Sequence, residues 1–173
     1  GPLEGIEIFV SILEDPLIRM CQADHLHFEG IAFEYSRGDG IKAEDCSNIS
    51  VSGCRTRNLG NNGIVVSEGE HNTIRSCDIH HTGDGGIRLS GGNRKTLEKC
   101  HHLATNNHIH HMGSWTRCNQ SAIWISGVGI VVSHNEIHDG PHNAINLSGN
   151  EHSIEYNHIH HVCGETGDVG AFY

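Results

Sequence analysis

A repeat of about 23 residues runs through the chain, and it restricts the possible folds more strongly than any other feature of the sequence. Each unit has an apolar or small residue at an equivalent anchor position, and the anchors are Ile41, Ile64, Ile87, Ile123, Ile145 and Ala171. Their separations are 23, 23, 36, 22 and 26 residues, so the third interval contains an insertion. Units this short cannot each bury a hydrophobic face, whereas stacked units bury one continuous core.

The pattern inside each unit predicts short β-strands. Apolar and polar residues alternate, as in Ile123-Trp124-Ile125, and a period of two is typical of a half-buried strand. A leucine-rich repeat has a similar period, but its recurring leucines are absent here. We therefore predict an all-β fold, a single-stranded right-handed parallel β-helix of about six coils. The coils are expected to occupy residues 17–173 with an insertion at about 90–120, and residues 1–16 to form a lead-in or partial cap.

Stacked coils place equivalent residues about 4.8 Å apart, so columns of side chains can be read from the sequence. Asn107, Asn135 and Asn157 share one column, which predicts an inward ladder of amides that bond one another and the turn backbone. Cys54 and Cys77 occupy the same column in earlier coils, and we expect buried free thiols there. The chain has seven cysteines and no CxxC pair, so a zinc ribbon is not expected.

The charge balance restricts the partners. Lys and Arg number 11 against 21 Asp and Glu, which gives a net charge of −10, and no Lys or Arg follows Arg117. Nucleic acid is therefore not expected as a partner, because phosphate binding needs clustered cations. No apolar run approaches the roughly 18 residues that span a bilayer, so no membrane partner is expected. A polyanionic substrate would require a bound metal in the C-terminal half.

Four runs carry a resemblance to a known family, namely Asp78–Ile87, Gly127–Asn135, Ile137–Ile145 and Glu165–Ala171. They resemble bacterial right-handed parallel β-helix proteins of the pectate-lyase-like superfamily, whose relatives include α-L-fucosidase-type glycoside hydrolases, polysaccharide lyases and epimerases. The resemblance implies a carbohydrate-active protein that is secreted, periplasmic or on the cell surface and acts on a plant, algal or microbial polysaccharide. Because such proteins usually continue further, it also implies that the chain is an internal excerpt.

Two polar columns flank the turn that enters each anchor strand, and they supply the candidate catalytic residues. We expect the side chains of the last coils to converge there, namely Asp139, His142, His161 and Asp168. A glycosidase needs two carboxylates about 5–5.5 Å apart for retention or roughly 6.5–9.5 Å apart for inversion. Asp139 and Asp168, with Glu165 as a substitute, can meet either requirement. The leading hypothesis is a glycoside hydrolase in which His142 or His161 orients these carboxylates. The alternative is that these polar groups only cap turns.

The same columns supply candidate sugar contacts at Asp84 and His111. Trp124, Asn146 and Phe172 follow their anchors in an outward column, where the aromatic rings could stack on sugars. Two other functions compete with hydrolysis. One is a non-catalytic, carbohydrate-binding or adhesin-like stack. The other is a metal-assisted lyase or epimerase, which needs a base at the sugar C5 and a cation on the uronate carboxylate. Ca²⁺ would have to supply that charge, and no other cofactor is predicted.

One histidine per coil follows a buried isoleucine, at His80, His110, His138 and His160. Alternation places these rings on the outer surface, where we expect a stacked ladder. Zinc binding by neighbouring imidazoles is conceivable, but an open stack enforces no closed four-ligand geometry. The histidines are therefore interpreted as an inert ladder or as sugar contacts, and no metal site is predicted.

Overall fold

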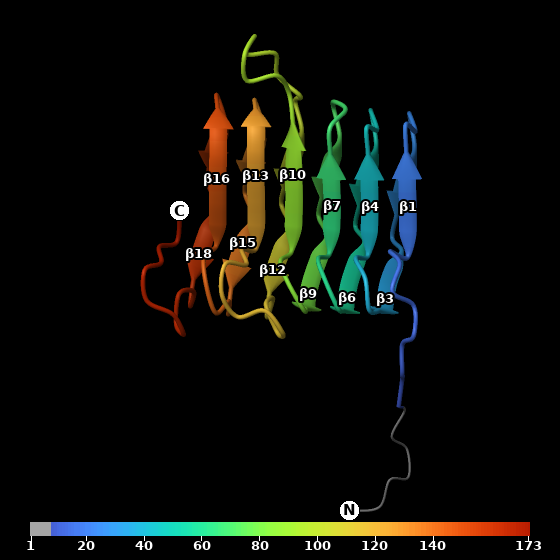
Figure 1. Cartoon of the computed structure of the whole chain (residues 1–173), viewed down its shortest axis with the longest axis vertical. Helices are drawn as coiled ribbons and strands as arrows, with labels where there is room; N and C mark the ends of the chain where they lie inside the picture. The colour runs from blue at the N-terminus through green and yellow to red at the C-terminus, as the bar shows by residue number, and fades with distance from the viewer. Residues whose placement is uncertain (1–7) are drawn as a thin grey trace, which may run out of the picture.

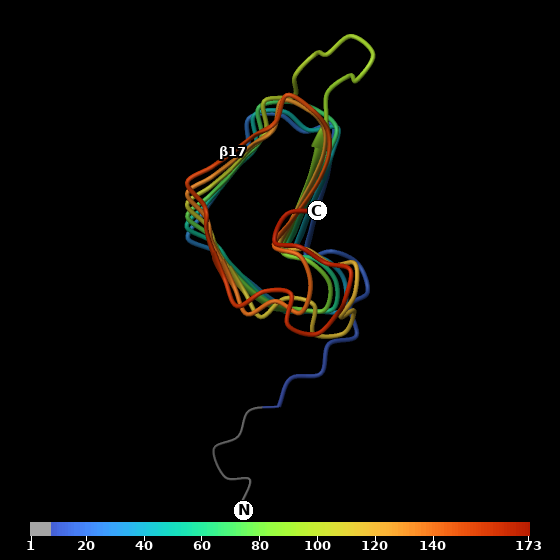
Figure 2. The same ribbon diagram turned by 90° about the vertical axis from the view of Figure 1, so that its left-hand side faces the viewer.

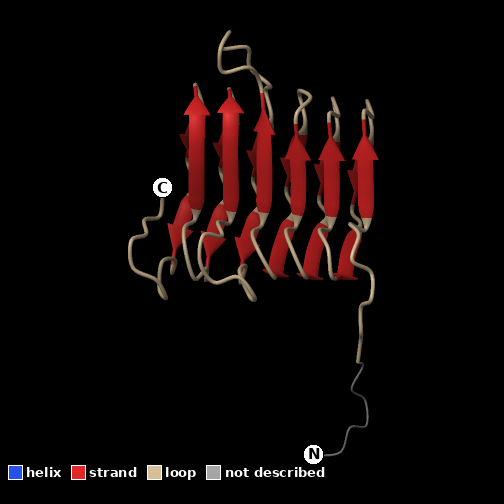
Figure 3. Cartoon of the chain, in the orientation of Figure 1, coloured by secondary structure: helices blue, strands red, loops and turns tan. Residues whose placement is uncertain are grey.

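The computed structural model describes residues 8–173, and this range contains strands and loops but no helix (Figures 1 and 3). Each coil contributes one strand to each of three parallel six-stranded sheets. Viewed along the stack, the six coils superimpose (Figure 2). The predicted right-handed parallel β-helix of about six coils is therefore confirmed. Among the described residues there is no helix with the length and hydropathy needed to cross a membrane.

The three sheets run along the whole stack. The first contains β1 (Ile18–Cys21), β4 (Ile41–Glu44), β7 (Ile64–Ser67), β10 (Ile87–Gly91), β13 (Ile123–Val128) and β16 (Ile145–Asn150). The second contains β2 (His27–Glu29), β5 (Ser50–Ser52), β8 (Thr73–Arg75), β11 (Leu103–Thr105), β14 (Val131–Ser133) and β17 (Ser153–Glu155). The third contains β3 (Ala32–Ser36), β6 (Arg55–Leu59), β9 (Asp78–Thr82), β12 (His108–His110), β15 (Glu136–His138) and β18 (His158–His160).

The predicted anchor column forms the centre of the core. Five anchors lie opposite one another in the first sheet and are at most 1% exposed, namely Ile41, Ile64, Ile87, Ile123 and Ile145. Burial of such a side chain contributes about 1.5–3 kcal/mol. The residue before each anchor must be small. A Cβ on Gly63 would lie 2.7 Å from Cγ2 of Ile79 and 2.8 Å from the carbonyl oxygen of Gly86.

The asparagine ladder is confirmed at the corner between the second and third sheets. Nδ2 of Asn107 donates to Oδ1 of Asn135 at 2.9 Å, and Nδ2 of Asn135 donates to Oδ1 of Asn157 at 2.9 Å. Each amide also donates to a backbone carbonyl of the preceding coil, at Ile74, Ala104 and Val132 respectively. The ladder therefore satisfies buried backbone groups where the strand ladder is interrupted.

The corner between the third and first sheets repeats an unusual backbone conformation. Its residues have φ between 49° and 62° in all six coils, and they are Tyr35, Asn58, His81, His111, Asp139 and His161. Left-handed φ values are uncommon outside glycine, but Asn, Asp and His tolerate them better than most residues. Because every coil repeats the conformation, it belongs to the geometry of the corner and not to one functional site.

The extra residues of the long interval are divided between two loops. Residues 92–102 join β10 to β11 and project from one end of the coil outline, while residues 111–122 join β12 to β13 (Figures 1 and 2). Between them, β11 and β12 keep their register with both neighbouring coils. Residues 1–7 of the predicted lead-in lie outside the described residues. In the part of the lead-in before β1, the backbone oxygens of Leu13 and Asp15 accept hydrogen bonds from the hydroxyl group of Ser36.

The prediction for the last anchor is wrong by one residue. Ile145 pairs with Phe172 and not with Ala171, and the backbone nitrogen of Ile145 donates to the carbonyl oxygen of Ala171 at 2.9 Å. Residues 161–170 form an irregular loop instead of a regular turn. The length of the repeat therefore does not predict which residue after this loop pairs with Ile145. Phe172 therefore occupies the anchor position, and Tyr173 follows it in the outward column.

Candidate functional site

Imidazoles and carboxylates cover the outer face of the third sheet over its last four coils. We call this surface the histidine face, and its members are Asp78, His80, His108, His110, Glu136, His138, His158 and His160. Strand alternation produces it, because the isoleucine in the middle of each strand points into the core and its two neighbours point outward. The side chains of His80, His110 and His138 are only 13–16% exposed, so the rings are packed closely together.

The predicted histidine ladder is confirmed as a stack of parallel rings. The centroids of His80 and His110 are 4.8 Å apart, those of His110 and His138 are 5.1 Å apart, and those of His138 and His160 are 4.8 Å apart. The planes of each pair lie within 6° of parallel. Burial lowers the pKa of His110 to about 4, and the neighbouring rings of His108 and His80 oppose its protonation further.

The corner residues hold the ladder rings in place. In three coils a 2.7 Å contact joins the two Nδ1 atoms of consecutive histidines, at His80–His81, His110–His111 and His160–His161. In the remaining coil Nδ1 of His138 bonds Oδ2 of Asp139 at 2.7 Å. Each ladder ring therefore uses Nδ1 toward the corner, and its Nε2 atom is directed to the opposite side of the ring.

A pocket of about 460 Å³ lies at this corner, and we call it the corner pocket. Its charged and imidazole lining consists of His81, His111, Arg117, Asp139, His161 and Glu165. The pocket exists because the loop 111–122 and the loop 161–170 both leave the regular outline beside the corner column. Four coils therefore contribute side chains to one concave surface, which is the usual setting of a ligand site.

The charges of the corner pocket are arranged in one ion pair and one hydrogen-bonded carboxylate. Nε of Arg117 donates to Oε2 of Glu165 at 2.7 Å, and a second guanidinium nitrogen contacts the other carboxylate oxygen. The hydrogen bond from His138 lowers the pKa of Asp139, so this carboxylate is ionised at neutral pH. Burial, followed by repulsion from His111, lowers the pKa of His81 and keeps that imidazole neutral.

The structure brings together four of the predicted site residues, because His111, Asp139, His161 and Glu165 all line the corner pocket. His142 and Asp168 do not line it, so the corner pocket does not bring these two residues together with Asp139. His142 is 5% exposed because the C-terminal loop crosses it, and its carbonyl oxygen accepts a hydrogen bond from the nitrogen of Cys163.

Asp168 is exposed and lies in the irregular loop that precedes the last pairing. Asp168 is not among the residues that line the corner pocket with Asp139, and the loop that carries it does not follow the regular register. The carboxylate that shares the pocket with Asp139 is Glu165, which the sequence offered only as a substitute.

The remaining predicted sugar contacts lie elsewhere. Trp124 and Asn146 pair in register on the outer face of the first sheet, and the Arg88 guanidinium lies 4.7 Å from the Trp124 ring centroid. The Arg88 guanidinium therefore occupies one face of this ring. Asp84 supports the pocket loop through its backbone, because its carbonyl oxygen accepts a hydrogen bond from Gly113 at 2.7 Å. Phe172 has the anchor register described above and is not in the outward column.

Sequence reasoning missed three site residues. Arg117 lies in an insertion without a period, so no column predicted its pairing with Glu165. Asp78 and Glu136 precede the buried isoleucines of β9 and β15. Their column could have been predicted from the repeat in the same way as the histidine ladder. Each forms a trio with two imidazoles whose donor atoms lie within 4.8 Å of one another, namely Asp78 with His80 and His110, and Glu136 with His138 and His160.

A larger open hollow of about 1060 Å³ lies under the loop 92–102, at the opposite end of the first sheet. Its lining includes Glu68, Glu70, Arg94 and Lys95. These are long side chains of mixed sign, and no imidazole is among them. The only pKa shift at this hollow among the described residues is that of Cys100, which burial raises. The corner pocket is therefore the better candidate for a catalytic site.

A family model described as a right-handed beta helix region matches residues 17–109, which is more than half of the 173 residues. One similar solved structure is the Azotobacter vinelandii mannuronan C-5 epimerase AlgE4 A-module, with 12% identity and a TM-score of 0.53. The match covers 90% of this chain and 56% of that module, so the chain spans little more than half of the module's length. At this identity the likeness concerns the fold. A comparison with curated proteins gave no match.

Proposed function

Because the chain belongs to the family of right-handed β-helix regions, we propose that it is a polysaccharide-modifying module whose corner pocket binds the sugar. The observation that carries this proposal is the composition of the pocket. One guanidinium, two carboxylates and three imidazoles from four coils line a single concavity of about 460 Å³. A polysaccharide can extend from it along the wall of stacked strands. The similar fold of a module named for epimerisation of mannuronan gives further support.

The reaction that these groups favour is removal of the C5 proton of a uronate, as in an epimerase or a lyase. That reaction needs a cation beside the sugar carboxylate and a base beside C5. Arg117 lines the pocket and supplies this cation, a charge that the sequence alone assigned to Ca²⁺. A guanidinium has five N–H donors. Glu165 and the carbonyl oxygen of Gly113 engage three of its nitrogen atoms, and two N–H groups are left for a substrate carboxylate.

The base is the carboxylate of Asp139. The hydrogen bond from Nδ1 of His138 lowers the pKa of Asp139, so this carboxylate is ionised at neutral pH and can take the C5 proton of the sugar. The imidazoles of His81 and His111 line the same pocket and stack with the centroids 5.1 Å apart and the planes 1° from parallel. These two rings therefore form a wall of the pocket that can contact the sugar.

Hydrolysis is the second candidate function, and the pairing of Asp139 with Glu165 favours it. Both carboxylates line the same pocket, which is the minimal requirement of a glycosidase. A glycosidase also needs one carboxyl group whose pKa is raised so that it can act as an acid. The pKa of Asp139 is lowered instead, so Asp139 suits the role of base or nucleophile and Glu165 would have to be the acid.

The test is incubation of the full chain with neutral and uronate-containing polysaccharides, followed by analysis of binding and of products. We expect uronate polymers to bind and to give either C5-inverted residues or unsaturated ends. New reducing ends without unsaturation would indicate hydrolysis and contradict the proton-transfer mechanism. Binding without any product would indicate a carbohydrate-binding module, and the absence of both would overturn the proposed function.

Asp139→Asn is the informative variant, and Asp45→Asn is its matched control. Both aspartates are exposed corner residues with left-handed φ, 50° for Asp139 and 52° for Asp45, and asparagine tolerates that conformation. Only Asp139 lines the corner pocket. We expect Asp139→Asn to lower turnover at least tenfold and Asp45→Asn to leave it unchanged.

A further inference from the structure

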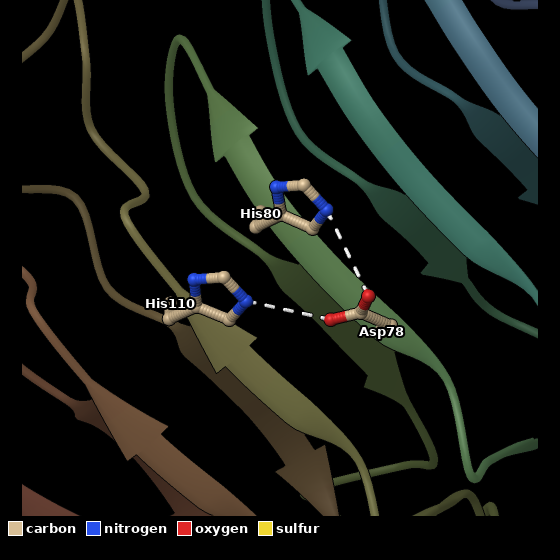
Figure 4. Close-up of side chains that lie close together, drawn as sticks. All are labelled: Asp78, His80 and His110. Atoms are coloured by element: carbon tan, nitrogen blue, oxygen red, sulfur yellow. Dashed lines mark ion pairs between the residues drawn. The ribbon is translucent and has the colours of Figure 1, made fainter.

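We propose that Asp78, His80 and His110 form a binding site for a divalent transition-metal ion of the zinc type. The three side chains lie on the histidine face, where β9 supplies Asp78 and His80 and β12 supplies His110 (Figure 4). This inference goes beyond the proposed function, since it concerns a different set of side chains and needs no substrate. Nothing in the sugar chemistry described above uses these three residues.

The donor atoms already have nearly the spacing that a metal requires. Oδ1 of Asp78 lies 3.4 Å from Nε2 of His110, and Oδ2 of Asp78 lies 3.7 Å from Nε2 of His80. Ligand atoms bound to a tetrahedral zinc at about 2.0–2.1 Å lie about 3.4 Å from one another. All donors of the trio lie within 4.8 Å of each other, so small rotations of the imidazoles would close the site.

One oxygen of Asp78 has no hydrogen-bond partner. Oδ1 is buried, yet within the described part of the chain no donor reaches it with hydrogen-bond geometry. The nearest atoms are ring nitrogens of His108 and His110, both 3.4 Å away. A buried acceptor without a donor is costly, and a cation bound at this point would satisfy it.

The rings are oriented as metal ligands are in proteins. A ligating imidazole commonly uses one nitrogen for the metal and donates the other N–H group to a neighbouring acceptor, which fixes the ring. Nδ1 of His80 contacts Nδ1 of His81 at 2.7 Å, and Nδ1 of His110 contacts Nδ1 of His111 at 2.7 Å. Both Nε2 atoms are therefore directed toward Asp78.

The same arrangement occurs a second time, two coils further along the stack. Glu136 of β15 replaces Asp78, His138 replaces His80 and His160 of β18 replaces His110. Oε1 of Glu136 lies 3.7 Å from Nε2 of His160. Here the outer partner of the ladder ring is a carboxylate, because Nδ1 of His138 bonds Asp139 at 2.7 Å. The second trio differs in one contact, because Nε2 of His138 lies 2.8 Å from Nε2 of His108. The repeat thus supplies two similar trios, about 10 Å apart by strand spacing.

The donor set determines which ions fit. Two imidazoles and one carboxylate suit zinc and neighbouring first-row metals, whereas calcium prefers six to eight oxygen ligands. Three protein ligands leave one position of a tetrahedron open, and the half-buried outer face of the sheet admits water or a ligand group there. His108, whose Nδ1 lies 3.4 Å from Asp78, is the nearest additional donor.

The experiment measures zinc binding by the full chain, prepared without a polyhistidine tag and freed of metal with a chelator. Titration against a chromogenic chelator is expected to give two equivalents per chain, and cobalt is expected to give the visible absorption of a tetrahedral or five-coordinate site. His110→Ala and Asp78→Asn should each weaken the affinity of one equivalent at least tenfold. Loss of a residue that only hydrogen-bonds a metal ligand already weakens metal binding roughly 10- to 100-fold. Calcium should not compete.

A matched control is available in the same fold. His71 and His101 also stack, with centroids 4.8 Å apart and planes 4° from parallel, but among residues 8–173 they form no trio with a carboxylate. His101→Ala should leave both equivalents unchanged. Equal zinc binding by His110→Ala and the native chain, or equal weakening by His101→Ala, would overturn the proposal. Circular dichroism of each variant separates a lost ligand from a lost fold, and Asp78→Asn keeps the side-chain shape. The readout is independent of sugar turnover, so failure of either proposal leaves the other distinguishable.

Discussion

The imidazole rings of His80 and His110 stack face to face, with their centroids 4.8 Å apart, although the two residues belong to different coils. The stacking follows from the register of β9 and β12, which places these residues directly opposite each other. The polar side chains of the candidate sites are therefore arranged in columns along the stack of coils. A residue acts with its equivalents in the neighbouring coils and with the corner residue that follows it.

The asparagine ladder predicts a position-dependent loss of stability. Asn135→Ala removes the two bonds that its Oδ1 accepts from Asn107 and the two that its Nδ2 donates to Ala104 and Asn157. We expect a loss of about 2–4 kcal/mol in the free energy of unfolding, because buried partners lose their hydrogen bonds. Asn157→Ala, at the half-buried end of the ladder, should cost less. Denaturant unfolding measures both, and equal losses would contradict the ladder.

Buried histidines predict that acid destabilises the fold. Burial lowers the pKa of His102 from its ordinary value of 6.5 to about 4, and its side chain is completely buried. The unfolded chain then binds more protons than the folded chain between pH 6.5 and 4, so this contribution is complete above pH 6.5 and is lost as the pH falls to 4. For His102 alone the loss at pH 4.5 is on the order of 2–3 kcal/mol.

Unfolding free energies at pH 7.5 and pH 4.5 test this prediction. His102→Gln should reduce the difference between the two values, and His25→Gln, at an exposed corner, should not. The ladder histidines His80 and His110, whose pKa values are also lowered by burial, act in the same direction. An unfolding free energy that is flat from pH 7.5 to 4.5 would refute the packing described for these rings.

Thiol reactivity should follow burial. All seven cysteines are free, and Cys21 and Cys118 are exposed, whereas Cys46, Cys54, Cys77 and Cys100 are buried. Burial raises the pKa of Cys77 to about 11, so the reactive thiolate is scarce as well as inaccessible. Mass spectrometry after brief alkylation should find Cys21 and Cys118 modified in the native chain and the four buried thiols modified only after unfolding. Rapid native modification of Cys77 would contradict this account.

The ion pair of the corner pocket should contribute to binding and not to stability. Arg117 and Glu165 are about half exposed, and exposed pairs stabilise proteins by roughly 0–1 kcal/mol. Arg117→Gln should therefore leave the free energy of unfolding nearly unchanged and weaken uronate binding at least tenfold. Lys95→Gln, in the other inserted loop, serves as the control of equal charge change. Equal affinities of the two variants for a uronate polymer would exclude Arg117 from the site.

The fold could be predicted because stacking imposes the same demands on every coil. Ile64 and Ile87 both fill the core, and Asn107 and Asn135 both bond to backbone groups at a corner. The same residue types therefore recur in the sequence at the spacing of one coil. The same logic placed Asp139 and His161 beside one pocket. The family resemblance was likewise confirmed by the match to right-handed β-helix regions.

The parts that could not be predicted lie where the period is interrupted. Arg117 reaches Glu165 from an inserted loop, and no column relates the two. Asp168 was placed by counting through the C-terminal loop, and the irregular path of this loop buries His142 and leaves Asp168 outside the pocket. Such loops follow local contacts that a repeat does not encode. The pocket consequently combines corner residues, whose positions the repeat predicts, with loop residues, whose positions it does not predict.

The most direct test of the central claim is proton exchange at the sugar C5 in the corner pocket. Uronate oligosaccharides incubated with the native chain in D₂O should acquire deuterium at C5 or unsaturated ends, detected by proton NMR. Asp139→Asn and Arg117→Gln should lower the rate at least tenfold, while Asp45→Asn should match the native chain. Cleavage that yields only saturated, undeuterated products, or exchange that is unaffected by the two pocket variants, would contradict the account.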